Sequence, residues 1–284
     1  MQTQFSTFAL VDAHVHVHPG FARDSFLDAA LRSFRGAAAK LGRQDDFLGC
    51  LMLAEMGPAR WFRRAWNREE GEGTWRFERT AEAESLVARR TSGEMLLVLA
   101  GRQIATREGL EVLALAGDAS VPNGLSFDET LHRVRASSAL PVLPWGFGKW
   151  WGRRGKLVAG ALAQRGSGLL FLGDNAGRPS LRSEPPLFQV ARDSGVAVLP
   201  GSDPLPLPWH AVRAGSYGFV LEGGLDAASP AGGLRRRLRD LRESPPVFGR
   251  RVALPGFLRD QAALRGRRRF PVAQSAEGTA EVAP

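Results

Sequence analysis

Short apolar segments alternate with helical patterns along most of this 284-residue chain, and that alternation restricts the folds open to it. Strands separated by helices are typical of parallel βαβ units, and so many units in about 220 residues predict an α/β barrel. The expected strands are Phe8–Val17, Phe47–Leu53, Met95–Ala100, Glu111–Leu115, Leu140–Pro144, Gly168–Leu172, Val196–Leu199 and Tyr217–Leu221. The expected helices are Arg23–Leu41, Thr80–Arg90, Phe127–Ser137, Lys156–Arg165 and Pro186–Ser194.

Other segments depart from this rhythm. Residues 100–117, "AGRQIATREGLEVLALAG", contain two apolar runs joined by a short polar stretch, which predicts a hairpin or a sharp strand reversal. We expect a barrel domain over residues 1–223, in which residues 59–79, rich in tryptophan and charge without a period, form an inserted loop or lid. Residues 224–271 are expected to form a basic helical extension packed on the barrel, and residues 272–284 a disordered tail.

Composition limits the chemistry that the chain can support. The single cysteine, Cys50, excludes a disulfide framework and a thiolate cluster, so a metal ion would need imidazole and carboxylate ligands, which suit zinc, manganese or iron. No apolar run reaches membrane-spanning length and no signal-peptide pattern opens the chain, so we expect a cytoplasmic protein with no membrane partner. The net charge of +9, almost wholly arginine, favours anion recognition or reflects composition alone.

Three of the five histidines lie at alternate positions of "LVDAHVHVHPGF", residues 10–21. In an extended strand His14, His16 and His18 point to the same face, about 7 Å apart, so their ring nitrogens can converge on one ion. A half-buried edge strand with a polar histidine face is the alternative. The nearby Asp12 and the stop at Pro19 favour metal ligation.

Polar groups also follow the later strands. In a barrel of parallel strands, the residues at the carboxyl ends of the strands surround one mouth, where function resides. Those groups include Glu55, Gln103, Glu111, Asp174, Asn175 and Asp203.

The stretch "LPWGFGKWWGRRGK", residues 143–156, combines flexible glycines, fixed positive charge and flat aromatic rings. This combination predicts a recognition loop for a small anionic or phosphorylated ligand, although tryptophans packed over the barrel rim are an equal alternative. The candidate substrate-binding residues at this mouth are Lys149, Arg102, Trp145, Arg153 and Asn175.

The order of these motifs resembles the PHP (polymerase and histidinol phosphatase-like) family of metal-dependent phosphoesterases. "DAHVH", a strand ending in an acid, "GRQ…EGLEVLALAG", "PVLPW", "GDN" and "VLPGSD" follow the family's order over about residues 10–223. The resemblance implies a distorted seven-stranded (βα) TIM-like barrel. It also implies that His14, His16 and Asp203 correspond to metal ligands.

The match to the family's ligand set is incomplete. Met56 replaces a histidine, Gln103 replaces the glutamate that bridges two cations, and Trp145 stands near a third expected histidine. Glu55 and Glu111 occupy the positions of a family aspartate and histidine.

We therefore expect one divalent ion at most, held by His14, His16 and Asp203 with an open position for water, or none if the site is degenerate. Glu55 and Glu111 are the candidate catalytic bases. Further metal ligands, or residues that support the ligands from behind, could come from Asp12, His18, Gln103 and His210.

Several functions fit these patterns. The first is a PHP-like hydrolase acting on a phosphoester or related anion, and the second is a binding or regulatory protein that has lost catalysis. An amidohydrolase-type barrel also begins with H-x-H, but its bridging lysine and central histidines cannot be placed. Nucleic-acid binding could occur only through the non-specific basic surface, since no recognised motif accompanies the charge.

Overall fold

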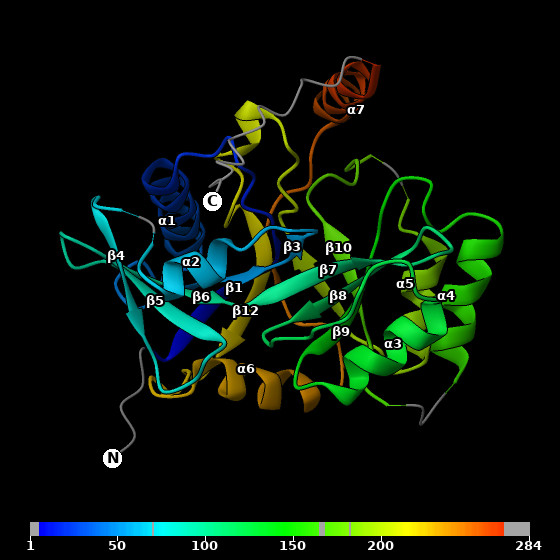
Figure 1. Cartoon of the computed structure of the whole chain (residues 1–284), viewed down its shortest axis with the longest axis horizontal. Coiled ribbons are helices and arrows are strands. Elements are labelled where there is room, and N and C mark those ends of the chain that lie inside the picture. Colours follow the sequence, from blue (N-terminus) through cyan, green and yellow to red (C-terminus); the bar gives the residue numbers. More distant parts are fainter. Residues whose placement is uncertain (1–5, 70, 165–167, 182, 270–284) are drawn as a thin grey trace, which may run out of the picture.

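The structure is a computed structural model that describes residues 6–69, 71–164, 168–181 and 183–269. Its strands form two sheets (Figure 1). The first has the order β13 (Val247–Gly249), β12 (Tyr217–Glu222), β1 (Phe8–Val15), β2 (Leu48–Leu53), β6 (Met95–Leu99), β5 (Ser85–Arg90), β4 (Trp75–Arg79). The second has the order β11 (Val198–Gly201), β10 (Phe171–Asn175), β9 (Leu140–Pro144), β8 (Glu111–Leu115), β7 (Gly101–Ala105), β3 (Glu55–Met56).

Helices cover the outer faces of both sheets and one end of the inner core. They are α1 (Arg23–Lys40), α2 (Trp61–Trp66), α3 (Phe127–Ala136), α4 (Arg153–Ala163), α5 (Pro186–Asp193), α6 (Pro230–Arg239) and α7 (Leu254–Arg269), with a short 3-10 turn at Pro208–His210. Figure 1 shows α6 and α7 at opposite ends of the sheets. None of the helices in the described ranges is long and apolar enough to cross a membrane.

Side chains from both sheets meet in one inner apolar core. Val11 of β1 and Met52 of β2 join Leu113 and Val142 from the second sheet, and all four are at most 1% exposed. Leu234 of α6 is part of the same cluster. The two sheets therefore enclose a shared interior, as the walls of a barrel do.

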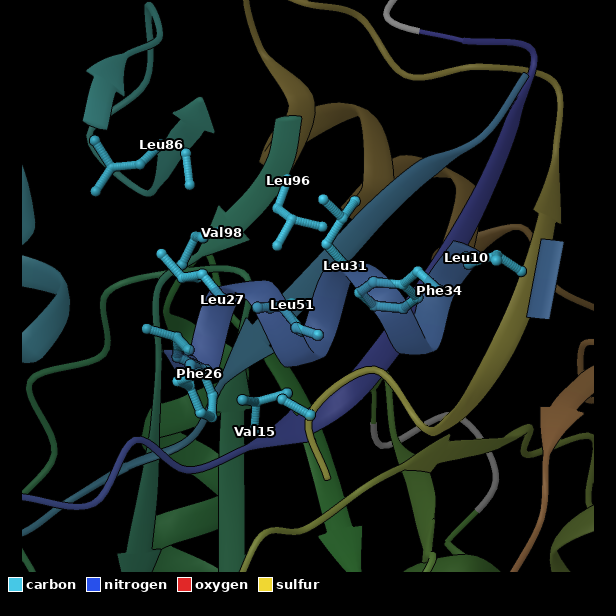
Figure 2. Packing of buried hydrophobic residues seen from close by; sticks show 14 of the residues in the cluster. Leu10, Val15, Phe26, Leu27, Leu31, Phe34, Leu51, Leu86, Leu96 and Val98 are labelled. Atoms are coloured by element: carbon cyan, nitrogen blue, oxygen red, sulfur yellow. The ribbon is translucent and has the colours of Figure 1, made fainter. Parts of the chain in front are cut away.

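A second core lies between the first sheet and α1, as Figure 2 shows. The helix presents Phe26, Leu27, Leu31 and Phe34 along one face, and they pack against Leu10, Leu51, Leu96 and Val98 of the sheet. Spacings of about one and two turns place these four residues together, which explains why this segment folds as an amphipathic helix. A third cluster packs α3, α4 and α5 on the second sheet.

The predicted α/β class is confirmed, but a closed TIM-like barrel is not observed in the described residues. Hydrogen bonding runs through two separate sheets, in which β1 pairs antiparallel with β12, and β8 pairs antiparallel with both β7 and β9. Antiparallel neighbours need no crossover helix, so they interrupt the βα rhythm that the sequence suggested. The predicted reversal over residues 100–117 is confirmed as the β7–β8 hairpin.

Two other expectations were wrong. The segment Thr80–Arg90, predicted as a helix, contains strand β5, which pairs antiparallel with β6 through a tight turn at Gly93. Residues 59–79, predicted as a loop or lid, contain α2 and the edge strand β4, joined in the described part by a loop. In both segments apolar residues such as Trp75 and Leu86 enter the core beneath α1, and this tertiary burial outweighs the local charge pattern.

The remaining boundaries agree within a few residues, and the strand predicted at Gly168–Leu172 is shifted to Phe171–Asn175. Arg165, the predicted end of α4, and the predicted disordered tail at residues 272–284 lie outside the described residues.

Candidate metal centre

Strand β1 carries two imidazoles to its carboxyl end. His14 and His16 are 6% and 5% exposed, and their ring centroids lie 4.8 Å apart. The pairing of β1 with β2 shifts register between Asp12 and Val15, and such an irregularity re-aims the side chains near it. The two Nε2 atoms come within 3.0 Å of each other.

Asp203 reaches the same place from the second sheet. It follows β11 with a φ of +46°, a left-handed conformation that aspartate tolerates better than most residues. Its backbone N–H donates to the carbonyl of His14 over 2.8 Å. Gly201 permits this approach, because a Cβ there would lie 2.4 Å from the His14 nitrogen.

The three ligand atoms have the spacing of one coordination sphere. His14 Nε2 and His16 Nε2 lie 3.7 and 3.5 Å from Asp203 Oδ1, and 3.0 Å from each other. A triangle with these sides has a point about 2.0 Å from all three corners, which matches zinc–nitrogen and zinc–oxygen bond lengths. The described residues thus contain a donor set that fits a single divalent ion.

Hydrogen bonding alone does not account for the crowding at His14. Its Nε2 faces His16 Nε2, Asp203 Oδ1 and, at 3.3 Å, Gln103 Oε1, yet a neutral ring nitrogen can donate only one proton. Burial lowers the pKa of His16 to about 3, and the neighbouring His14 acts in the same direction, so His16 is neutral at pH 7. Neutral imidazoles are the form that binds a metal ion.

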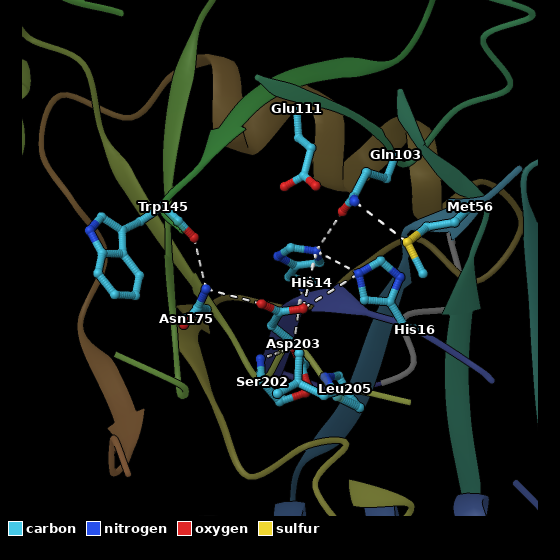
Figure 3. Close-up of polar contacts among 12 residues, drawn as sticks. His14, His16, Met56, Gln103, Glu111, Trp145, Asn175, Ser202, Asp203 and Leu205 are labelled. Carbon is cyan, nitrogen blue, oxygen red and sulfur yellow. Dashed lines mark hydrogen bonds and ion pairs between the residues drawn. The ribbon is translucent and has the colours of Figure 1, made fainter. Parts of the chain in front are cut away.

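Asn175, at the end of β10, holds the outer oxygen of the carboxylate. Its Nδ2 donates to Asp203 Oδ2 over 3.0 Å and to the carbonyl of Trp145 over 2.8 Å (Figure 3). With Oδ2 engaged in this way, Oδ1 remains directed at His14 and His16. Such hydrogen bonds to a ligand carboxylate fix its orientation.

These residues line a cavity of about 290 Å³. In Figure 3, Gln103, Glu111 and Met56 approach the imidazoles from one side, and Asp203 and Asn175 from the other. The lining is completed by His18, Trp145, Gly146, Phe147, Lys149, Gly177, Pro204, Leu205, Pro206, Phe257, Asp260, Gln261 and Leu264.

An ion pair shares this cavity. Lys149 Nζ contacts Glu111 Oε1, and the two side chains are 36% and 22% exposed. The predicted recognition loop therefore directs its lysine into the cavity. Trp150 packs instead against Phe188 in the outer core, 5.6 Å between ring centroids, so this tryptophan follows the rim-packing alternative.

The additional candidate ligands lie near the site without joining the triangle. His18 lines the cavity, with its Nε2 2.8 Å from the carbonyl of Pro204. Asp12 is fully buried and accepts the backbone N–H groups of His14, Ser202 and Gly215. It therefore anchors the strands that carry the site.

His210 has both ring nitrogens occupied elsewhere. Nδ1 accepts the backbone N–H of Leu205 over 2.9 Å, and Nε2 lies 3.0 Å from Asp260 Oδ2. The ring is 0% exposed. It joins the loop after Asp203 to α7 and is not one of the three residues of the ligand triangle.

Three other predicted residues lie outside this cavity. Glu55 accepts the backbone N–H of Phe62 over 2.9 Å, and Arg102 donates to the carbonyl of Gly57; both line a different cavity. Neighbouring side chains of a strand point to opposite faces. Because Met56 of β3 and Gln103 of β7 face the histidines, the residues before them, Glu55 and Arg102, face the other way. Arg153 is exposed at the start of α4 and is absent from the lining.

Sequence reasoning missed the contribution of α7. Its Phe257, Asp260, Gln261 and Leu264 line the cavity, although the segment was expected only as part of a basic extension packed on the barrel, with no place in the site. The spacing of i, i+3, i+4 and i+7 puts these four residues on one helical face. That spacing was the signal available in the sequence.

The contact between His210 and α7 predicts a pH-dependent stability. Burial lowers the pKa of His210 to about 4, with Arg213 acting in the same direction and Asp260 opposing them. The unfolded chain binds more protons between pH 6.5 and 4, so this contribution is complete above pH 6.5 and lost toward pH 4.

We expect the free energy of unfolding of the chain, relative to a His210→Gln variant, to fall by about 3 kcal/mol from pH 7 to pH 4, measured by urea denaturation. A His132→Gln variant, changed at an exposed histidine, should keep the profile of the unmodified chain. If the free energies of unfolding of the unmodified chain and of His210→Gln differ by the same amount from pH 7 to pH 4, the pH dependence does not come from His210.

Comparison with known proteins gives weak likenesses. No family model and no curated protein matches the chain. PsfC from Pseudomonas syringae PB-5123 has 13% identity and a TM-score of 0.48, over 92% of this chain and 99% of that one. The lesion-specific endonuclease PfuEndoQ from Pyrococcus furiosus has 12% identity and a TM-score of 0.49, over 82% of this chain and 56% of that one.

A complex of Endonuclease Q with a 27-mer duplex bearing an abasic lesion has 10% identity and a TM-score of 0.48, over 82% of this chain and 57% of that one. These likenesses are too weak to assign a chemical role to the cavity, so that role is inferred from the residues that line it.

Proposed function

We propose that this chain is a metal-dependent hydrolase of the PHP type that acts on a small phosphoester or a similarly charged ester. The observation that carries the proposal is the triangle of His14, His16 and Asp203, whose corners can share one divalent ion at about 2.0 Å. The motif order in the sequence supports the same proposal.

The cavity offers groups for the chemistry as well as for the ion. A bound divalent cation would act as a Lewis acid and lower the pKa of water in its open position. Lys149 is positioned to neutralise the charge of an anionic substrate, since one contact with Glu111 leaves other N–H groups of its ammonium available. Glu111 is the proposed proton acceptor, because it faces His14 and Gln103 across the cavity.

The second candidate is a binding protein without turnover. The observation that favours it is that Glu111, the proposed proton acceptor, already contacts the ammonium of Lys149. The amidohydrolase alternative needs a bridging lysine, and Lys149 contacts a carboxylate instead. Nucleic-acid binding through the basic surface stays a prediction.

The test is hydrolysis of a phosphomonoester by the chain loaded with zinc or manganese. A Lys149→Met variant should lower kcat/KM by about 10- to 100-fold, because hydrogen bonds to charged groups contribute about 1.5–3 kcal/mol. Its metal content should not change. Lys156→Met, at an exposed lysine of α4, is the matched control and should retain full activity.

Metal-loaded protein that binds the ester without turning it over would favour the second candidate. Equal activity in the Lys149→Met and Lys156→Met variants would show that Lys149 does not contribute to the proposed reaction.

A further inference from the structure

A second cavity, of about 430 Å³, lies apart from the candidate metal centre. The apolar part of its lining includes Phe62, Ala100 and Val121, each at most 9% exposed. Three arginines join this lining, with two carboxylates: Arg60, Arg63, Arg102, Glu55 and Asp118.

Alternation along two paired strands separates the two cavities. In the β3–β7 ladder Glu55 pairs with Arg102, and Met56 pairs with Gln103. Met56 and Gln103 line the metal cavity and approach the imidazoles in Figure 3, whereas Glu55 and Arg102 line the second cavity. The two cavities therefore lie on opposite faces of the same short ribbon.

Two of the arginines converge on one point. Arg102 donates to the carbonyl of Gly57 over 2.9 Å, and Arg60 approaches the same oxygen at 3.4 Å. Neither guanidinium has a carboxylate within 4.0 Å among the described residues. Like charges this close repel each other, so an anion between them would relieve the repulsion.

The acidic groups of the cavity are already engaged. Asp118 pairs with Arg63 over 3.3 Å, and Glu55, which accepts the backbone N–H of Phe62, shares its negative charge between Arg60 and Arg102. Three guanidinium groups against two carboxylates leave one positive charge, carried by the pair Arg60 and Arg102. Planar guanidinium groups match the geometry of phosphate oxygens and can bind them in a bidentate manner.

We propose that this second cavity is a phosphate-binding site, with Arg60 and Arg102 as its anion-binding residues. The ligand is a tetrahedral phosphate, free or as the head group of a monoester whose organic part contacts Phe62 and Val121. This site is independent of the metal centre and of the reaction proposed there.

The experiment is calorimetric titration of the full chain with inorganic phosphate and, separately, with phenyl phosphate. Arg102→Met and Arg60→Met variants should each weaken binding at least about tenfold, because each loses charged hydrogen bonds. Arg153→Met and Lys156→Met, changed at exposed positions of α4 outside both cavities, should bind as the unmodified chain does. If both ligands bind equally well, the ligand of the site is free phosphate. If phenyl phosphate binds more tightly, the ligand is a phosphomonoester.

Loss of binding in Lys149→Met with retention in Arg60→Met and Arg102→Met would place the anion in the metal cavity and overturn the proposal. Absence of phosphate binding by the unmodified chain would also overturn it. Thermal unfolding of each variant separates a binding defect from misfolding, and the exposed Arg60 provides a substitution outside the core if Arg102→Met is unstable.

Discussion

Replacing both His14 and His16 by alanine is expected to abolish tight binding of a divalent ion while the chain stays folded. The two rings supply two corners of the ligand triangle, and Asp203 alone would leave the ion with a single protein ligand from this set. Loss of an outer-shell partner already costs about 10- to 100-fold in metal affinity, so loss of two direct ligands should exceed about 100-fold. Metal titration of the variant, with circular dichroism as the check on folding, measures both effects.

The matched control is His18→Ala. His18 lines the same cavity and its ring lies 5.6 Å from that of His16, but its Nε2 contacts the carbonyl of Pro204 and is not one of the three ligand atoms. This variant should keep its metal ion. Equal losses of affinity in His18→Ala and in the double variant would show that the triangle is not the binding site.

Asp12→Ala is expected to produce the largest loss of stability among the substitutions considered. Its carboxylate accepts three backbone N–H groups, from His14 at 3.2 Å, Ser202 at 2.7 Å and Gly215 at 2.8 Å. Alanine would leave these buried donors without partners, at about 1–3 kcal/mol each. Burial raises the pKa of Asp12 to about 6, so part of the carboxylate's contribution is offset by its own desolvation.

We expect the free energy of unfolding to fall by about 3–5 kcal/mol in Asp12→Ala, measured by urea denaturation at pH 7. Metal affinity should fall as well, because the carboxylate holds β1 beside the segment that carries Asp203. Asp12→Asn keeps one acceptor oxygen, so its free energy of unfolding should lie between those of Asp12→Ala and the unmodified chain. An Asp12→Ala variant within 1 kcal/mol of the unmodified chain would show that these hydrogen bonds do not anchor the site.

Strong periodicity made much of the fold predictable. The strands at Glu111–Leu115 and Leu140–Pro144 match their predicted bounds, and helices α1, α3 and α5 begin at the predicted residues. Apolar spacing determines the three helices, because each packs one face on a sheet, whereas the two strands are recognised as short continuous apolar runs, buried along nearly their whole length. The segment containing β5 was missed because its pairing with β6 is a tertiary event that local charge pattern does not reveal.

The candidate site was partly predictable for a similar reason. His14 and His16 lie at the carboxyl end of β1 and Asp203 follows β11, so their places at strand ends indicated their proximity. Glu55 and Arg102 were placed at the wrong cavity, since a shift of one position along a strand reverses the face of a side chain. The position of α7 at the cavity could not be predicted, because it depends on contacts between distant segments such as the one between His210 and Asp260.

The metal content of the unmodified chain tests the central claim most directly. Protein purified without chelator, exposed to excess zinc and desalted should retain one ion per chain by elemental analysis. Only one ligand triangle occurs among the described residues, and Gln103 lacks the negative charge that would hold a second cation close to the first. Two or more tightly held ions per chain, or none, would contradict the account.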